Sequence, residues 1–251
     1  MSGLLRLAME RLARPLDEKE LGRSAMVFAP HPDDETLGCG GTILQKRRAG
    51  ASMRIVFMTD GAASHAHLTS AAELRAMRHR EALEAVEVLG LSPADVSWLG
   101  LPDGKLGLWR EQATHRVSEL LQRYRPRQLL LPYARGEHRD HVATNSIVYQ
   151  AVGRVGLPVT LLEYPVWSWR QWPAMIRGLR FLRELRTSVA VQEVLARKRL
   201  ALERHVSQMR RRDGHPGWGT LGDIDQGEFL ACLFQNYEYY RRVDLLEPWR
   251  R

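Results

Sequence analysis

Cysteines, long apolar runs and low-complexity tracts are scarce or absent in this chain of 251 residues. Its two cysteines, Cys39 and Cys232, exclude the disulfide framework that holds many small secreted domains together. No apolar run approaches the ~20 residues that span a bilayer. Residues 1–16 also lack the uninterrupted apolar core of a signal peptide. We therefore expect a cytoplasmic protein.

The formal net charge is +8 at pH 7, and most of the excess is arginine. Such a charge favours anionic partners, namely phosphorylated substrates, acidic lipid surfaces or nucleic acid, without choosing among them. Residues 167–186 combine aromatic side chains with five arginines. This pattern is typical of a segment at a membrane interface, or of an aromatic lobe packed on a sheet. We find no nucleic-acid-binding motif and expect no nucleic acid; peripheral contact with an anionic membrane, at its inner face, stays a hypothesis.

Short apolar runs alternate with helical patterns over the first two thirds of the chain. Strands are expected at residues 24–30, 53–58, 96–99, 128–131 and 159–163, and helices at 36–49, 71–89, 108–124 and 141–152. This alternation predicts an α/β fold: a Rossmann-like, doubly wound, mainly parallel sheet flanked by helices. If the strand order begins 3-2-1-4, the first and fourth strands are neighbours.

The pattern changes after residue 163. Residues 164–172 are aromatic and irregular, and helices are expected at 174–186, 192–209 and 227–239. No linker separates this region from the rest, so we expect a single domain over residues 1–251. It would comprise an N-terminal amphipathic extension (1–23), a Rossmann-like core (24–163) and a C-terminal substrate lobe (164–251).

Two clusters of polar residues follow the first and fourth expected strands: HPDDE at 31–35 and HRDH at 138–141. In a doubly wound sheet these loops converge at the topological switch point. A catalytic zinc takes three His or carboxylate ligands and leaves a position for water. The clusters can supply two imidazoles and one carboxylate, leaving a second carboxylate, Asp33 or Asp34, as general base. A spare imidazole could then be a general acid or an electrostatic clamp. The sequence therefore predicts a metal-dependent hydrolase.

The ordered set of motifs resembles the LmbE-like, or PIG-L, family of N-acetylglucosaminyl deacetylases. HPDDE, with glycines at 40–41, is similar to the first family motif, and HRDH is similar to the second, with Arg139 in place of a proline. Further similar pieces are TDG at 59–61, R-x-x-E at 78–81, PDG at 102–104, Lys198 and HVSQ at 205–208. The resemblance covers roughly residues 24–210.

The resemblance implies a role for each matched residue. The zinc ligands would be His31, Asp34 and His141, and Asp33 would be the general base. His138 would be the protonated partner that assists the leaving amine, and Asp140 would orient it. Arg78 and Asp103 match substrate-contacting positions, whereas Gly136 stands where some members carry an oxyanion-binding tyrosine.

The activity implied is zinc-dependent removal of the N-acetyl group from an N-acetylglucosamine-type sugar, with phosphorylated or lipid-linked sugars among the expected substrates. Two alternatives stand beside it. The same ligands suit Fe²⁺ and hence a non-haem iron enzyme. The basic charge would also fit a membrane- or nucleic-acid-binding protein with a vestigial site.

Overall fold

The computed structural model describes residues 3–135, 138–168, 179 and 182–245, with side chains from residue 7 onward. Its centre is an eight-stranded sheet in the order β1-β7-β8-β6-β5-β2-β3-β4. The strands are β1 (Arg14–Pro15), β2 (Ala25–Ala29), β3 (Met53–Thr59), β4 (Val96–Leu101), β5 (Gln128–Pro132), β6 (Val159–Tyr164), β7 (Thr187–Ala190) and β8 (Tyr237–Leu245).

The five strands expected from the sequence form the parallel part of this sheet. Strand β2 pairs with β3 on one side and β5 on the other, β3 pairs with β4, and β5 pairs with β6, all in parallel. In order of the chain this is 3-2-1-4-5, so the predicted fold and strand order are confirmed. The carboxyl ends of β2 and β5 therefore lie side by side, where open α/β sheets bind ligands.

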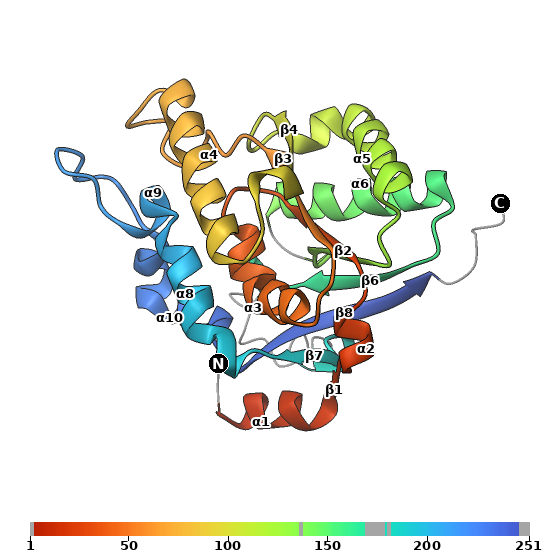
Figure 1. Ribbon diagram of the computed structural model, residues 1–251. Coiled ribbons are helices and arrows are strands. Elements are labelled where there is room, and N and C mark those ends of the chain that lie inside the picture. The colour runs from red at the N-terminus through yellow and green to blue at the C-terminus, as the bar shows by residue number, and fades with distance from the viewer. Residues whose placement is uncertain (1–2, 136–137, 169–178, 180–181, 246–251) are drawn as a thin grey trace.

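Helices cover both faces of the sheet (Figure 1). One face carries α3 (Asp34–Arg48), α4 (Ala71–Val88) and α8 (Leu195–Glu203), and the other carries α5 (Arg110–Tyr124) and α6 (Arg139–Val155). Both faces are covered because alternate residues of β2 are apolar on each side. Val27 belongs to the apolar core on the first face, and Met26 and Phe28 belong to the core on the second. Continuous apolar strands of this kind are typical of a sheet buried on both faces.

The remaining short elements lie mostly at the two ends of the chain. They are α1 (Gly3–Leu12), α2 (Glu18–Leu21), η1 (Pro93–Asp95), η2 (Leu106–Trp109), η4 (Gln192–Val194), α9 (Val206–Met209), η5 (Leu221–Gly227) and α10 (Glu228–Leu233). Strand β1, from the expected N-terminal extension, pairs in parallel with β7 at the edge of the sheet. One sheet thus contains strands from all three parts of the chain.

The C-terminal part departs from the prediction in two places. The helix expected at 227–239 ends at Leu233, and Tyr237–Leu245 is instead a strand, antiparallel to β6 and β7. Aromatic and β-branched residues favour this pairing. The helix expected at 192–209 is interrupted at His205, whose φ and ψ are −78° and 61°. Most of the helix expected at 174–186 lies outside the described residues.

Close packing of α3 on the sheet depends on its glycines. A Cβ at Gly38 would lie 2.3 Å from Cδ2 of Tyr164, and one at Gly41 would lie 2.5 Å from Cγ1 of Val191. Tyr164 is itself held because its hydroxyl donates to the carbonyl oxygen of Phe28 at 2.8 Å. These glycines let the first turn of α3, with its acidic residues, reach the carboxyl end of β2.

Candidate metal centre and its cavity

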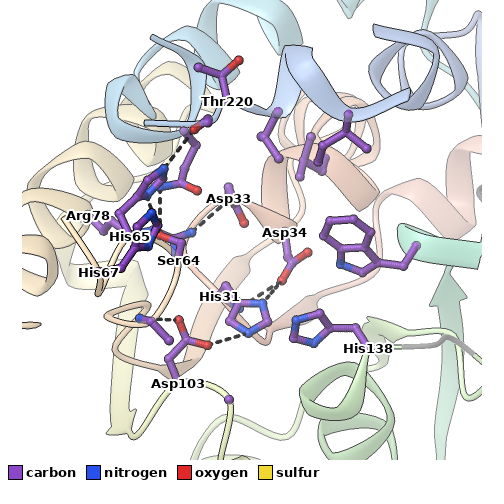
Figure 2. Close-up of a pocket in the computed structure, with 18 of the residues that line it drawn as sticks. His31, Asp33, Asp34, Ser64, His65, His67, Arg78, Asp103, His138 and Thr220 are labelled. Atoms are coloured by element: carbon purple, nitrogen blue, oxygen red, sulfur yellow. Dashed lines mark hydrogen bonds and ion pairs between the residues drawn. The ribbon is translucent and has the colours of Figure 1, made fainter. Parts of the chain in front are cut away.

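A cavity of about 530 Å³ lies at the carboxyl ends of the parallel strands. Figure 2 shows side chains from several loops pointing into it. The core contributes His31, Asp33, Asp34, Arg78, Asp103 and His138, and the C-terminal lobe contributes Trp167, Gln208, Thr220, Leu221 and Ile224. A volume of this order is in the range of small-molecule sites.

The carboxylate of Asp34 lies between two imidazoles. Its Oδ2 atom is 3.0 Å from Nδ1 of His31 and 3.2 Å from Nε2 of His141. Nε2 of His141 is buried and lacks a hydrogen-bond partner among the described residues, so its approach to Asp34 is not oriented as a hydrogen bond. Two ligand atoms of a tetrahedral zinc ion lie about 3.3 Å apart when each bond is ~2.0–2.1 Å. The donor types and the spacing to Asp34 therefore fit a divalent metal ion.

The other ring nitrogen of His31 faces two further carboxylates. Nε2 lies 3.2 Å from Oδ1 of Asp103 and 3.3 Å from Oδ2 of Asp140. Asp140 also accepts from the backbone N–H groups of Gly104 and Leu106, at 2.7 and 3.1 Å. A carboxylate behind a histidine is the usual arrangement that orients a metal ligand. In this structure Asp140 is therefore placed to orient His31, whereas the resemblance assigns it to His138.

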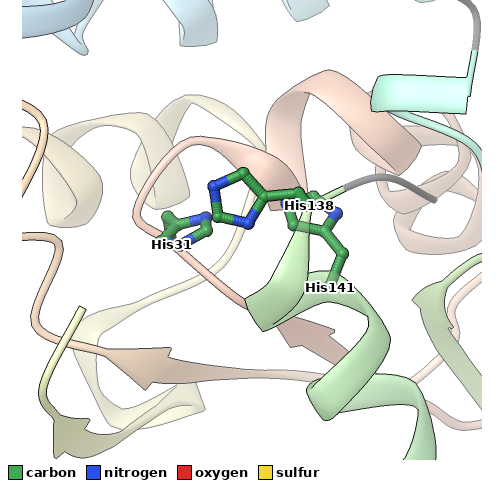
Figure 3. Close-up of side chains that lie close together, drawn as sticks. All are labelled: His31, His138 and His141. Carbon is green, nitrogen blue, oxygen red and sulfur yellow. The ribbon is translucent and has the colours of Figure 1, made fainter. Parts of the chain in front are cut away.

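In the part of the chain that the structure describes, two groups of side chains have ligand atoms that all lie within 4.8 Å of one another. They are His31 with His138 and His141, and His31 with Asp103 and Asp140. Figure 3 shows the three imidazoles gathered beside the start of α6. The ring of His138 is 4.8 Å from that of His31 and 5.0 Å from that of His141, between centroids. His31 belongs to each of these groups and also contacts Asp34.

The electrostatics of the cluster favour positive charge at its centre. Burial lowers the pKa of His31, but its hydrogen bonds to the carboxylates of Asp103, Asp140 and Asp34 outweigh this effect and raise that pKa well above the usual value. Burial raises the pKa of Asp34, yet His141 and His31 together bring it well below the usual value. A ring of ionised carboxylates around one imidazole attracts a cation.

Asp33, next to this cluster, has a different environment. Burial raises the pKa of Asp33 to about 7, although the guanidinium of Arg78 acts in the opposite direction. Nη2 of Arg78 donates to Oδ2 of Asp33 at 3.0 Å and to the carbonyl oxygen of Pro32 at 2.6 Å. A carboxyl group with a pKa near neutrality is suited to accept a proton.

His138 lies half-buried at the mouth of the cavity, and its ring stacks with that of Trp167 at 5.9 Å between centroids. Burial, with the nearby His31 and His141, lowers the pKa of His138 to about 4. Its Nδ1 is buried without a hydrogen-bond partner among the residues that the structure describes. The free protein thus favours a neutral His138, in contrast to the protonated state that the resemblance implies.

All eight side chains singled out from the sequence lie around this one site. Gly136 is outside the described residues, and the nearby Tyr133 donates from its hydroxyl to Glu184. The sequence favours a solvated or substrate-contacting His65 over a metal ligand. In the structure its ring stacks on Trp218 at 4.1 Å, and its Nε2 lies 2.9 Å from the carbonyl oxygen of Gly219. These contacts hold residues 217–221 at the outer wall of the cavity. In the sequence, this wall is marked by Trp218, which stands between two glycines.

The family model for PIG-L, described as GlcNAc-PI de-N-acetylase, matches residues 26–152, just over half of the chain. Within the described ranges, no helix is both long and apolar enough to cross a membrane.

Two curated relatives carry sugar deacetylase names. Diacetylchitobiose deacetylase of Thermococcus kodakarensis is 30% identical over 142 residues, which cover 54% of this chain and 51% of that protein. The 1D-myo-inositol 2-acetamido-2-deoxy-alpha-D-glucopyranoside deacetylase 2 of Saccharopolyspora erythraea is 28% identical over 166 residues, covering 55% and 59%. The chain thus spans roughly half the length of these relatives.

Among solved structures, N,N'-diacetylchitobiose deacetylase of Pyrococcus horikoshii, in complex with its inhibitor MPG, is similar with a TM-score of 0.69. The similarity covers 97% of this chain and 91% of that chain at 22% identity. Because the identity is only 22%, this similarity establishes the fold alone.

Proposed function

Because the chain belongs to the PIG-L family, we propose that it is a metal-dependent deacetylase that removes the N-acetyl group from an N-acetylglucosamine-type sugar. One observation carries the proposal: a buried carboxyl group, Asp33, with a pKa near 7, adjoins the His31–Asp34–His141 donor set. A base beside a metal site, in a cavity of substrate size, is the arrangement that hydrolysis of an amide requires. The deacetylase names of the relatives support cleavage of an N-acetyl amide bond.

We assign the metal to His31, Asp34 and His141. In this assignment His31 would bind the ion through Nδ1, while Asp103 and Asp140, at 3.2 and 3.3 Å from its Nε2, would hold the ring in place. Zinc suits two imidazoles and one carboxylate, and Fe²⁺ suits the same set. When bound, the ion would polarise the substrate carbonyl and lower the pKa of water.

The protein's own side chains then handle the protons. Asp33 takes a proton from the water that attacks the acetamide carbonyl. Negative charge that develops on the substrate would raise the pKa of the neighbouring His138, so that His138 takes up a proton from solvent and delivers it to the departing amine nitrogen. Asp33 returns the proton that it took from water to solvent when acetate leaves. Arg78 keeps Asp33 oriented by its hydrogen bond of 3.0 Å. Acetate and a free amino sugar are the products.

Arg78 and Asp103 line the cavity and are assigned to contact the sugar. The net charge of +8 favours a sugar that bears a phosphate or a lipid phosphate. Helix α1 leaves Leu7 and Leu12 half exposed, which supports peripheral contact with an anionic membrane surface. The cytoplasmic location expected from the sequence stays part of the proposal.

A panel of N-acetylglucosamine derivatives tests the proposal: the free, phosphorylated, nucleotide-linked and lipid-linked sugars. We expect the zinc-loaded protein to release acetate from at least one of them, and Asp33→Asn to release none. Binding of one metal ion per chain without any acetate release would refute the sugar assignment. Dioxygen consumption in place of acetate release would identify an iron oxygenase. Flotation with anionic vesicles tests the membrane contact separately.

A further inference from the structure

Asp33 has a backbone conformation that L-amino acids rarely adopt. Its φ and ψ are 145° and −25°, in the region that favours glycine. A residue persists in such a conformation only when its surroundings hold it there. The contacts that hold Asp33 therefore belong to the machinery of the site.

One of these contacts comes from the buried carboxylate of Glu35. Its Oε2 atom accepts a hydrogen bond from the backbone N–H of Asp33 at 3.0 Å. Its Oε1 atom accepts from the hydroxyl of Thr36 at 2.6 Å and lies 3.0 Å from Nε2 of His205. Glu35 and His205 are both completely buried. A buried carboxylate needs such partners to stay in one orientation.

His205 comes from the C-terminal lobe, 170 residues from Glu35 in sequence. It is the residue at which the helix expected at 192–209 is interrupted, between α8 and α9. The short helix α9 makes two further contacts with the site. Ser207 donates from its N–H and hydroxyl to Glu81, at 2.8 and 2.7 Å, and Gln208 donates to the hydroxyl of Ser64 at 3.4 Å. The interruption thus turns His205 toward the carboxylate that supports Asp33.

We propose that His205 is a positioning residue for Asp33 and acts through Glu35. Its imidazole N–H fixes the Glu35 carboxylate, and that carboxylate fixes the strained backbone of Asp33, so that the Asp33 side chain stays beside the metal ligands. The effect on catalysis rests on the proposed function, but the effect on the Asp33 backbone does not.

The test compares His205→Leu with His205→Gln. Glutamine can still donate an N–H to Glu35, whereas leucine cannot. In the metal-free protein we expect the amide proton of Asp33 to exchange with solvent roughly tenfold faster in His205→Leu, because a hydrogen bond to a charged acceptor is worth at least that factor. In the zinc-loaded protein we expect a kcat about 100-fold lower, a KM close to the wild-type value and one metal ion per chain. In His205→Gln, both the exchange rate at Asp33 and kcat should return most of the way to the wild-type values.

Lys198→Met separates positioning from loss of stability. Lys198 is also fully buried in the C-terminal lobe, but it contacts Glu238 and the carbonyl oxygens of Leu37 and Leu233. We expect Lys198→Met to lower the unfolding temperature while exchange at Asp33 and kcat of the folded enzyme stay close to wild type. Wild-type exchange at Asp33 in His205→Leu would overturn the proposal, as would equal losses of kcat in His205→Leu and Lys198→Met. If no sugar is deacetylated at all, the exchange measurement still decides the positioning claim.

Discussion

Arg78 donates a hydrogen bond of 3.0 Å from its Nη2 to Oδ2 of Asp33, and the two side chains are only 3% and 9% exposed. Burial raises the pKa of Asp33 to about 7, and the charge of Arg78 opposes this rise. The ionisation of the proposed base therefore depends on one buried arginine.

Replacing Arg78 should move the pH dependence of activity. Asp33 accepts a proton only when it is ionised, so kcat/KM should increase as the pH rises through the pKa of Asp33. In Arg78→Gln the stabilising charge is lost, so the acidic limb of the kcat/KM profile should move to higher pH by roughly 1–3 units.

The matched control for this prediction is Arg80→Gln, at an exposed position of the same helix. Its pH profile should equal that of the wild type. An acidic limb that stays in place in Arg78→Gln would show that Asp33 does not control it.

Metal binding should separate the proposed ligands from their supporting carboxylates. Asp34→Asn and His141→Ala should each abolish stoichiometric zinc binding, whereas Asp103→Asn should retain it with weaker affinity, by about 10–100-fold, as is usual for a residue behind a ligand. Zinc should also stabilise the wild type by about 2.7 kcal/mol at 100 times its Kd. Titration calorimetry and metal analysis measure zinc binding, and unfolding with and without zinc measures the stabilisation. Loss of zinc in Asp103→Asn with retention in Asp34→Asn would reverse the assignment of ligand and supporting carboxylate.

The ion pair between Lys198 and Glu238 should dominate the stability of the C-terminal lobe. Nζ of Lys198 lies 2.8 Å from Oε1 of Glu238, and that carboxylate accepts from the backbone N–H groups of Gly41 and Thr42. Removing one member of a buried pair costs about 3–5 kcal/mol, because the partner charge is left without compensation. Lys198→Met should lose this much in denaturant unfolding.

An exposed pair provides the comparison. Arg48 and Glu193 lie 3.0 Å apart but are 57% and 76% exposed, so Arg48→Met should change the free energy of unfolding by no more than about 1 kcal/mol. Equal effects in the two variants would mean that burial does not set the energy of the Lys198 pair.

The outer wall of the cavity should control the affinity for the larger part of the substrate. His65 holds this wall by stacking on Trp218 and by its contact with Gly219. His65→Leu should raise KM for a substrate with a second ring roughly tenfold, the value of a lost hydrogen bond with its packing, while kcat changes little. Trp218→Phe keeps an aromatic ring beside His65 but loses the hydrogen bond from Nε1 to the carbonyl oxygen of Ser207, so its KM should rise less than that of His65→Leu. A fall in kcat with unchanged KM in His65→Leu would place His65 in the chemistry instead.

The meeting of the two polar motifs was predictable because both follow strands whose order obeys a general rule. HPDDE and HRDH come after the first and fourth strands of a doubly wound sheet, and neighbouring carboxyl ends bring them together. The parallel strands were also predicted correctly. Each of them is a short, continuous apolar run bounded by turns, which is a local signal in the sequence.

Contacts over long sequence separations were not predictable. The pairing of Tyr237–Leu245 with β6 depends on a partner some 80 residues away, so local helical spacing misled the prediction there. The contact between His205 and Glu35 joins positions 170 residues apart, and no local pattern marks it. The wall around Trp218 is likewise held by His65, from a different loop. Tertiary packing decided these features, and it overrides local propensity.

The most direct test of the account is deacetylation in water labelled with ¹⁸O. For the best substrate of the panel, the account predicts acetate with one ¹⁸O atom and an equal amount of free amine, with both products absent for Asp33→Asn. Release of the amine with unlabelled acetate, or no cleavage of any N-acetyl sugar by protein that holds one metal ion per chain, would contradict it.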